Sequence, residues 1–201
     1  SGENIEFDSI NGSHIFKKNN TENFRINDDG EVRVTDNIVF STAGKGVYLG
    51  VTSATSANLL DDYEVGTWTP AYGGSSVAPT VTYDKQTGVY VKVGDFVHVQ
   101  GRLRTDATSG GSGNLRVTGL PFANINQSEA YSTFHIGFNN QWSADHFPTS
   151  GLLNASTSHV TLYTGRSSDF RDGRGIVINV SDLTNSTNSN DIIFSMTYRA
   201  A

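Results

Sequence analysis

Apolar and polar residues alternate along the chain in short stretches, and this pattern limits the fold more than any other feature of the sequence. In residues 96–104, Val97, Val99 and Leu103 fall on one face of an extended strand and polar side chains on the other. No window between residues 67 and 201 keeps a helical period. About eight such strands, joined by polar turns, predict an all-β fold in which residues 67–201 form a jelly-roll-like antiparallel β-sandwich. The strands are expected at 80–83, 88–91, 96–104, 114–117, 132–138, 159–163, 175–180 and 192–199.

The composition supports this class and argues against several functions. Hydrophobic residues make up 36% and charged residues 17% of the 201 positions, while glycine occurs 21 times, as expected for many short strands and turns. A net charge of −6 disfavours nucleic-acid binding. The absence of cysteine rules out disulfides and thiolate metal sites. No apolar run is long enough for membrane insertion, so no membrane partner is expected.

The N-terminal quarter of the chain is too thin to enclose a core by itself. Residues 1–52 alternate short apolar segments with turns, such as Asn27 to Gly30 between two apolar triplets. A single chain would leave side chains such as Phe24 and Ile26 only partly covered, whereas three copies wound around one axis would cover them. These residues therefore predict a short fibrous β shaft and a homotrimer. The junction is placed at 53–66 and the tip domain at 67–201. Ser1 in place of a methionine suggests that the native polypeptide extends further towards its N-terminus.

The junction carries a motif that resembles a known family. Residues 59–70 read LLDDYEVGTWTP, and residues 81–101 read VTYDKQTGVYVKVGDFVHVQG. With GSHIF at 12–16 and ENFRINDDGEV at 22–32, these segments are similar to tail-fibre and tailspike proteins of bacteriophages. The resemblance covers about residues 12–101. It implies an extracellular location in the phage tail of the virion, a homotrimer, and contact with other phage tail proteins through the N-terminal region.

Two long polar loops hold the candidate receptor-binding residues. Trp142 lies among Asn, Gln, Ser and Asp, and such a mixture suits a sugar, because an aromatic face meets its C–H surface and polar groups meet its hydroxyls. The alternative is that Trp142 packs against a neighbouring protomer. In the second loop, arginines beside one aromatic could contact an acidic glycan, the alternative being a solvated loop. The predicted ligand is a host cell-surface polysaccharide, and the predicted contacts are Trp142, Asp145, His146, Arg166, Phe170, Arg171, Asp172 and Arg174.

The sequence gives no reason to expect catalysis, a cofactor or a metal. Asp61, Asp62 and Glu64 could act as acid and base in glycoside cleavage, but their place in the junction motif favours capping or pairing between chains. The five histidines form no metal-binding motif. The chain is therefore expected not to be an enzyme. Two alternatives stay open, namely a purely structural trimerisation and registration module, or the non-catalytic end of a polysaccharide depolymerase tailspike.

Overall fold

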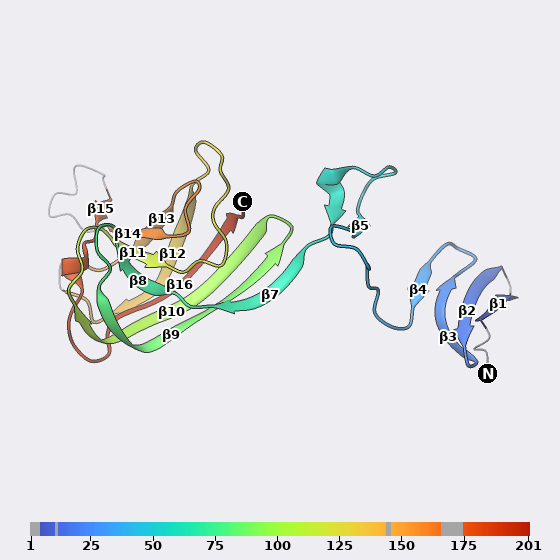
Figure 1. Cartoon of the computed structure of the whole chain (residues 1–201), viewed down its shortest axis with the longest axis horizontal. Coiled ribbons are helices and arrows are strands. Elements are labelled where there is room, and N and C mark those ends of the chain that lie inside the picture. The colour runs from blue at the N-terminus through green and yellow to red at the C-terminus, as the bar shows by residue number, and fades with distance from the viewer. Residues whose placement is uncertain (1–4, 11, 144–145, 166–174) are drawn as a thin grey trace. The chain divides into compact units, whose positions relative to one another are not determined.

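The computed structural model describes residues 5–10, 12–143, 146–165 and 175–201, and its regular structure there is almost entirely antiparallel β (Figure 1). The all-β prediction is confirmed. The chain divides into two compact units, Ser1–Val47 and Tyr48–Ala201. The division at 1–52, 53–66 and 67–201 stays a prediction. No helix among the described residues has the length and apolar character needed to span a membrane.

The first unit contains a four-stranded antiparallel sheet in chain order. Tight turns join its strands, and at the predicted turn the Gly30 amide donates to the Asn27 carbonyl at 3.0 Å while Gly30 takes a φ of +83°. Phe16 and Phe24 meet edge to face on neighbouring strands, with centroids 5.3 Å apart. The strands are β1 (Ile5–Ile10), β2 (Ser13–Lys18), β3 (Thr21–Ile26) and β4 (Val32–Val34).

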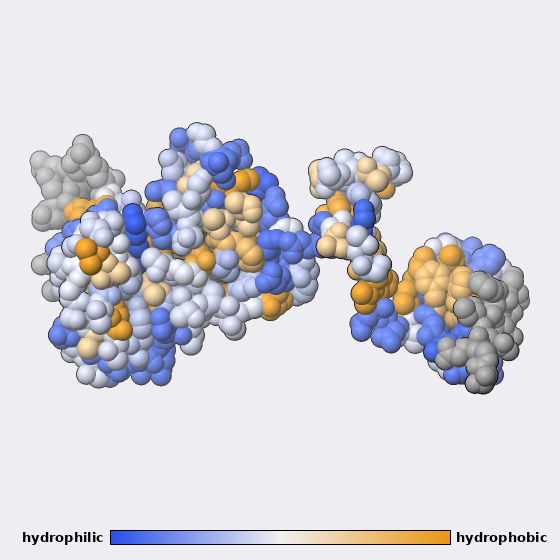
Figure 2. All heavy atoms as spheres, viewed as in Figure 1, coloured by the Kyte–Doolittle hydropathy of each residue, from blue (hydrophilic) through white to orange (hydrophobic). Residues whose placement is uncertain are grey.

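The chain between β4 and the second unit's large sheet exposes apolar side chains. Val39 is 83% exposed and Ile38 64%. Figure 2 shows hydrophobic residues on the surface of the segment between β4 and β5 (Val47–Tyr48). A short ladder pairs β5 with β6 (Leu59–Leu60), and one turn of 3₁₀-helix, η1 (Ser56–Asn58), lies between them.

The second unit is built on one continuous ten-stranded sheet. Its strand order is β7-β9-β10-β16-β12-β13-β14-β11-β8, with β15 paired to β14. A second 3₁₀ turn, η2 (Val180–Asp182), precedes the last strand. The strands are β7 (Tyr63–Trp68), β8 (Ala71–Gly74), β9 (Thr80–Val93), β10 (Phe96–Ser109), β11 (Leu115–Thr118), β12 (Ser132–Asn140), β13 (Ser150–Leu153), β14 (Val160–Thr164), β15 (Ile176–Val177) and β16 (Ser189–Arg199).

The connection between β7 and β8 shows that this sheet must curl. The two strands stand at opposite ends of the strand order, yet only Thr69 and Pro70 separate them in the chain. Because consecutive Cα atoms lie about 3.8 Å apart, the two ends of the sheet are held close together. The curled sheet therefore faces itself across one core, which supplies the two facing layers of the predicted sandwich.

The core lies between these layers and follows the predicted alternation. In β10, Val97, Val99 and Leu103 are fully buried, whereas Gln100 and His98 point outward, so the predicted faces of this strand are confirmed. Leu115, Phe134, Leu162 and Ile192 come from other strands to the same cluster. Trp68 belongs to it as well, at 7% exposure, which agrees with a structural role for the GTWTP motif.

Candidate functional site

The structure places Trp142, the first predicted receptor contact, at the margin of the core. Its indole is half-buried and meets Tyr72 edge to face, with ring centroids 5.9 Å apart. Its Nε1 donates to the Asp191 carbonyl oxygen at 3.2 Å. The ring and the polar tip of the indole are thus both engaged inside the protein. A role of the remaining surface in receptor binding stays a prediction.

His146 is the other predicted contact that the structure describes. Its side chain is 46% exposed, and Nδ1 lies 3.4 Å from Oδ1 of Asp182 in η2. The other six predicted contacts lie outside the described residues. They are Asp145, Arg166, Phe170, Arg171, Asp172 and Arg174.

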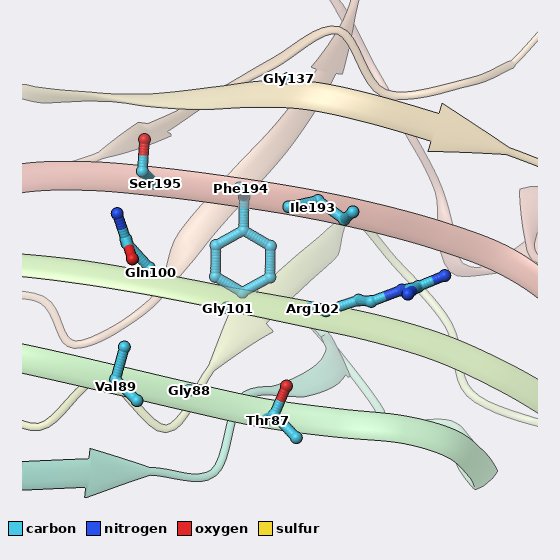
Figure 3. Close-up of a pocket in the computed structure, with 10 residues that line it drawn as sticks. All are labelled: Thr87, Gly88, Val89, Gln100, Gly101, Arg102, Gly137, Ile193, Phe194 and Ser195. Atoms are coloured by element: carbon cyan, nitrogen blue, oxygen red, sulfur yellow. The ribbon is translucent and has the colours of Figure 1, made fainter.

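A second candidate site lies on the outer face of the sheet, where side chains leave a groove running across β9, β10, β16 and β12. We call it the cross-strand groove. It is open to solvent, has a volume of about 460 Å³, and separates two rows of outward residues (Figure 3). Figure 3 shows Gln100 and Ser195 on one side of Phe194, and Arg102 and Ile193 on the other. The two rows are two residues apart along each strand, or about 7 Å. The lining consists of Thr87, Gly88, Val89, Gln100, Gly101, Arg102, Gly137, Ile193, Phe194 and Ser195.

The floor of the groove is backbone because the residues between the two rows face the core or lack a side chain. Gly88 and Gly101 are directly paired in the ladder, and Gly101 pairs on its other side with Phe194. A Cβ on Gly88 would stand 2.4 Å from the Trp68 Nε1, and one on Gly101 would stand 2.5 Å from the Phe194 Cζ. The core-side aromatic rings therefore occupy the space that side chains at these glycines would need, which fixes the floor.

The groove carries one well-anchored charge. The Arg102 guanidinium donates from Nε to Oδ1 of Asp191 at 3.0 Å and from Nη2 to Oδ2 at 2.8 Å. The Asp191 side chain is only 3% exposed, whereas that of Arg102 is 34% exposed. The hydrogen bond to Asp191 raises the pKa of the Arg102 guanidinium above its usual value. The guanidinium has five N–H donors in a planar fork, so this pair uses two of them and holds the group in a fixed orientation.

The chemistry of the groove is that of a binding surface. Hydroxyl groups of Thr87 and Ser195, the amide of Gln100 and the guanidinium of Arg102 can exchange hydrogen bonds with a hydroxylated ligand, and Val89 and Ile193 add apolar wall. Its lining holds no pair of carboxylates and no nucleophile beside a base.

Two carboxylates of the acidic junction cluster are engaged in contacts within the chain. Asp62 pairs with Lys92, and Glu64 accepts a hydrogen bond from the Tyr90 hydroxyl, which raises the pKa of Tyr90. Both contacts bridge β7 and its lead-in to β9 within one chain, so these two carboxylates have structural partners there. Pairing of the cluster between chains stays a prediction. Within the described ranges, no group of three or more potential ligand residues could hold a metal ion.

Sequence reasoning did not identify the groove, although a signal was present. Gly88 and Gly101 interrupt two long strands, and a glycine inside a strand often marks a site that a ligand or another group approaches closely. Their positions in the sequence do not show that the ladder sets them side by side.

Comparisons with known proteins find similarity to a phage depolymerase and to a tailspike protein. No protein-family profile matches the chain. A depolymerase of Klebsiella phage K64-1, described as specific for capsule KN4, is 32% identical over 79 residues, which is 39% of this chain and 10% of that protein. The crystal structure of the Dettilon tailspike protein aligns with a TM-score of 0.52 and 21% identity over 69% of this chain and 24% of its own. The chain thus corresponds to a small part of both proteins.

Part of this chain is thus similar in sequence to a phage depolymerase, and the chain shares its fold with part of a tailspike protein. The tailspike likeness concerns the fold alone, because its sequence identity is low.

Proposed function

We propose that this chain is part of a homotrimeric tail spike or fibre and contributes to attachment of the phage to host-surface polysaccharide. The cross-strand groove is the observation that carries the proposal. It is open along several strands, has polar groups in both walls and contains one oriented guanidinium, a combination that suits an extended hydroxylated polymer. The loop residues around Trp142 and His146, with Asp145, Arg166, Phe170, Arg171, Asp172 and Arg174, are proposed as a second contact surface. Other tail proteins are proposed to bind through the N-terminal region.

Binding of the chain to capsular polysaccharides of candidate hosts tests this proposal. The triple variant Thr87→Ala, Gln100→Ala, Ser195→Ala removes three hydrogen-bonding groups from the groove. At about 1 kcal/mol each, their loss should weaken binding at least tenfold. Thr82→Ala on the exposed part of β9 is the matched control. A triple variant that binds as tightly as the parent would exclude the groove as the contact surface.

A second candidate function is that the chain forms the non-catalytic end of a depolymerase. The observation that favours it is the match to a region making up 10% of the capsule-specific phage protein. On this reading, cleavage belongs to a longer polypeptide and the present residues contribute binding or assembly. The longer protein should then release oligosaccharides from host capsule, whereas the present 201 residues should not. Release of oligosaccharides by these residues alone would contradict this second candidate function.

A further inference from the structure

Strand β9 is oriented so that its valines face outward. Val89, Val91 and Val93 alternate with Gly88, Tyr90 and Lys92, and a period-2 apolar pattern normally marks the buried face. Here the valines are 51%, 38% and 44% exposed. The side chain of Lys92, in contrast, is 12% exposed and its Nζ lies 5.5 Å from the centre of the Phe122 ring.

Pairing between the strands accounts for this orientation. Trp68 stands opposite Gly88, and Tyr90 stands opposite Gly66, so that each aromatic ring fills the space over a glycine on the core side. Tyr90 also meets Phe122 edge to face, with centroids 5.6 Å apart. These aromatic contacts fix the inner face of β9, and the register leaves the valines outside.

The neighbouring strands extend the same apolar surface. The ladder aligns Tyr63 with Val93 and Phe96 in one row, and Val65 with Val91 and His98 in the next. Tyr63, Val65 and Phe96 are 70%, 61% and 60% exposed. Together with Val91 and Val93 they form what we call the outer apolar face, whereas Val89, in the next row, lines the cross-strand groove. The other outward residues of these rows are His98, Thr197 and Arg199. The His98 Nδ1 shares a hydrogen bond with the Thr197 hydroxyl at 2.9 Å, and Arg199, at the edge of the face, pairs with Asp95.

We infer that the outer apolar face is the surface on which a second copy of this chain docks. The inference rests on the homotrimer of the proposed function and names the strands that make the contact. At the stated exposures the five side chains present on the order of 500 Å², more than half of the roughly 800 Å² that each partner contributes to a standard stable interface. A patch of this size lies at the upper end of what monomers expose, and such patches are often functional.

The composition of the face distinguishes a permanent protein partner from a carbohydrate. Valine side chains offer a sugar no hydrogen bonds, and an apolar centre depleted of charge is typical of permanent homo-oligomer interfaces. The chain leading into β7 exposes further apolar residues, among them Val32, Val34, Ile38, Val39, Phe40, Val47, Tyr48, Leu49, Val51 and Leu60. Apolar side chains are thus exposed in each of the two units, and a further copy of the same chain supplies apolar partners for both sets.

The test compares two substitutions at equally exposed valines in the full chain. Val65 lies on the outer apolar face and is 61% exposed, whereas Val77 lies outside it and is 58% exposed. Light scattering should give the parent and Val77→Glu the mass of several chains, and Val65→Glu the mass of one chain, 21.7 kDa. Circular dichroism of the separated species checks that the monomer is folded. A parent that is monomeric at micromolar concentration would overturn the inference.

Cysteine labelling gives a second measurement that does not depend on dissociation. The chain has no cysteine, so Val65→Cys and Val77→Cys each introduce one thiol. In the assembled protein a maleimide should label position 65 at least tenfold more slowly than position 77. Equal rates in an oligomer would show that copies meet elsewhere. Polysaccharide binding is measured on the same samples and on the groove variant. An oligomeric parent that binds no polysaccharide would contradict the proposed attachment alone. A parent that binds polysaccharide as a monomer would contradict this inference and leave the attachment intact.

Discussion

Phe194 lies directly opposite Gly101 in the β10–β16 ladder, and its ring covers the glycine on the core side. The same relationship recurs between Trp68 and Gly88, and between Tyr90 and Gly66. Trp68 and Phe194 in turn meet edge to face at 6.0 Å. An aromatic residue that covers a cross-strand glycine compensates for the missing side chain. These pairs therefore fix the register of β7 against β9 and of β10 against β16, and the rings of Trp68 and Phe194 lie on the core side of the groove floor.

Replacing Gly101 by alanine should destabilise the fold. The new Cβ would stand 2.5 Å from the Phe194 Cζ and 2.9 Å from the Thr87 carbonyl oxygen. Forcing a methyl group into such a packed position costs about 1–3 kcal/mol. Gly137→Ala is the control, because a Cβ there meets nothing within 4 Å. Urea unfolding measures both variants, and a Gly101→Ala midpoint equal to that of Gly137→Ala would contradict the packing described here.

Removing Arg102 should lower the stability of the fold, because the buried Asp191 carboxylate would lose its partner. Breaking a buried ion pair from one side typically costs 3–5 kcal/mol. Because Arg102 is one-third exposed, we expect Arg102→Met to lose about 3 kcal/mol, at the low end of that range. Arg199→Met breaks a pair with Asp95 whose side chains are 49% and 62% exposed, and should cost no more than about 1 kcal/mol.

A further substitution tests the cause of that loss. Asp191→Asn in the Arg102→Met background removes the uncompensated charge and should recover part of the stability. Equal effects of Arg102→Met and Arg199→Met in chemical unfolding would show that Asp191 does not depend on its partner.

Alkaline pH should weaken the folded state through its buried tyrosines. Burial raises the pKa of Tyr83 to about 12 and that of Tyr198 to about 12, and also raises the pKa of Tyr72. An unfolded tyrosine ionises near pH 10. From about pH 10 to about pH 12 the unfolded chain has released protons that the folded chain keeps, so the free energy of unfolding falls as pH rises.

Urea titrations at a series of fixed pH values measure this slope. Tyr198→Phe should make the slope shallower, because one linked ionisation is lost, although the variant also loses the hydrogen bond to the Phe122 carbonyl at 3.0 Å. Stability that stays constant across this range would show that these phenols ionise freely in the folded protein.

The sequence was sufficient for most strands of the large sheet and for the core side of β10. It missed the short strands β7, β8 and β13, and it divided the long strand β9 into two. Val97, Val99 and Leu103 were assigned to the buried face from alternation alone, and the structure confirms them. The curl of the sheet was not accessible in this way, because it depends on β7 and β8 lying at the two ends of the strand order. Pairing between distant strands leaves no local pattern in the chain.

The candidate site was harder to predict for the same reason. Its floor requires Gly88 beside Gly101 and Phe194, a coincidence of register among three strands. In β9 the alternation is also ambiguous, because either Val89 and Val91 or Tyr90 and Lys92 could face the core. Covering of glycines by aromatic rings decides the orientation, and this is a property of pairs of strands.

Trp142 provides a test that separates packing from receptor binding. Its contact with Tyr72 and its hydrogen bond to the Asp191 carbonyl predict that Trp142→Ala lowers the unfolding midpoint. A fully buried aromatic costs about 3–5 kcal/mol on truncation, so a half-buried one should cost less, about 2 kcal/mol. Trp142→Phe keeps an aromatic ring against Tyr72 but loses the indole donor, so it should recover part of that stability. Adsorption to host cells, measured at a temperature where each variant is fully folded, then reports on binding alone. If Trp142→Ala unfolds with the parent while adsorption falls, the indole serves the receptor and contributes little to packing.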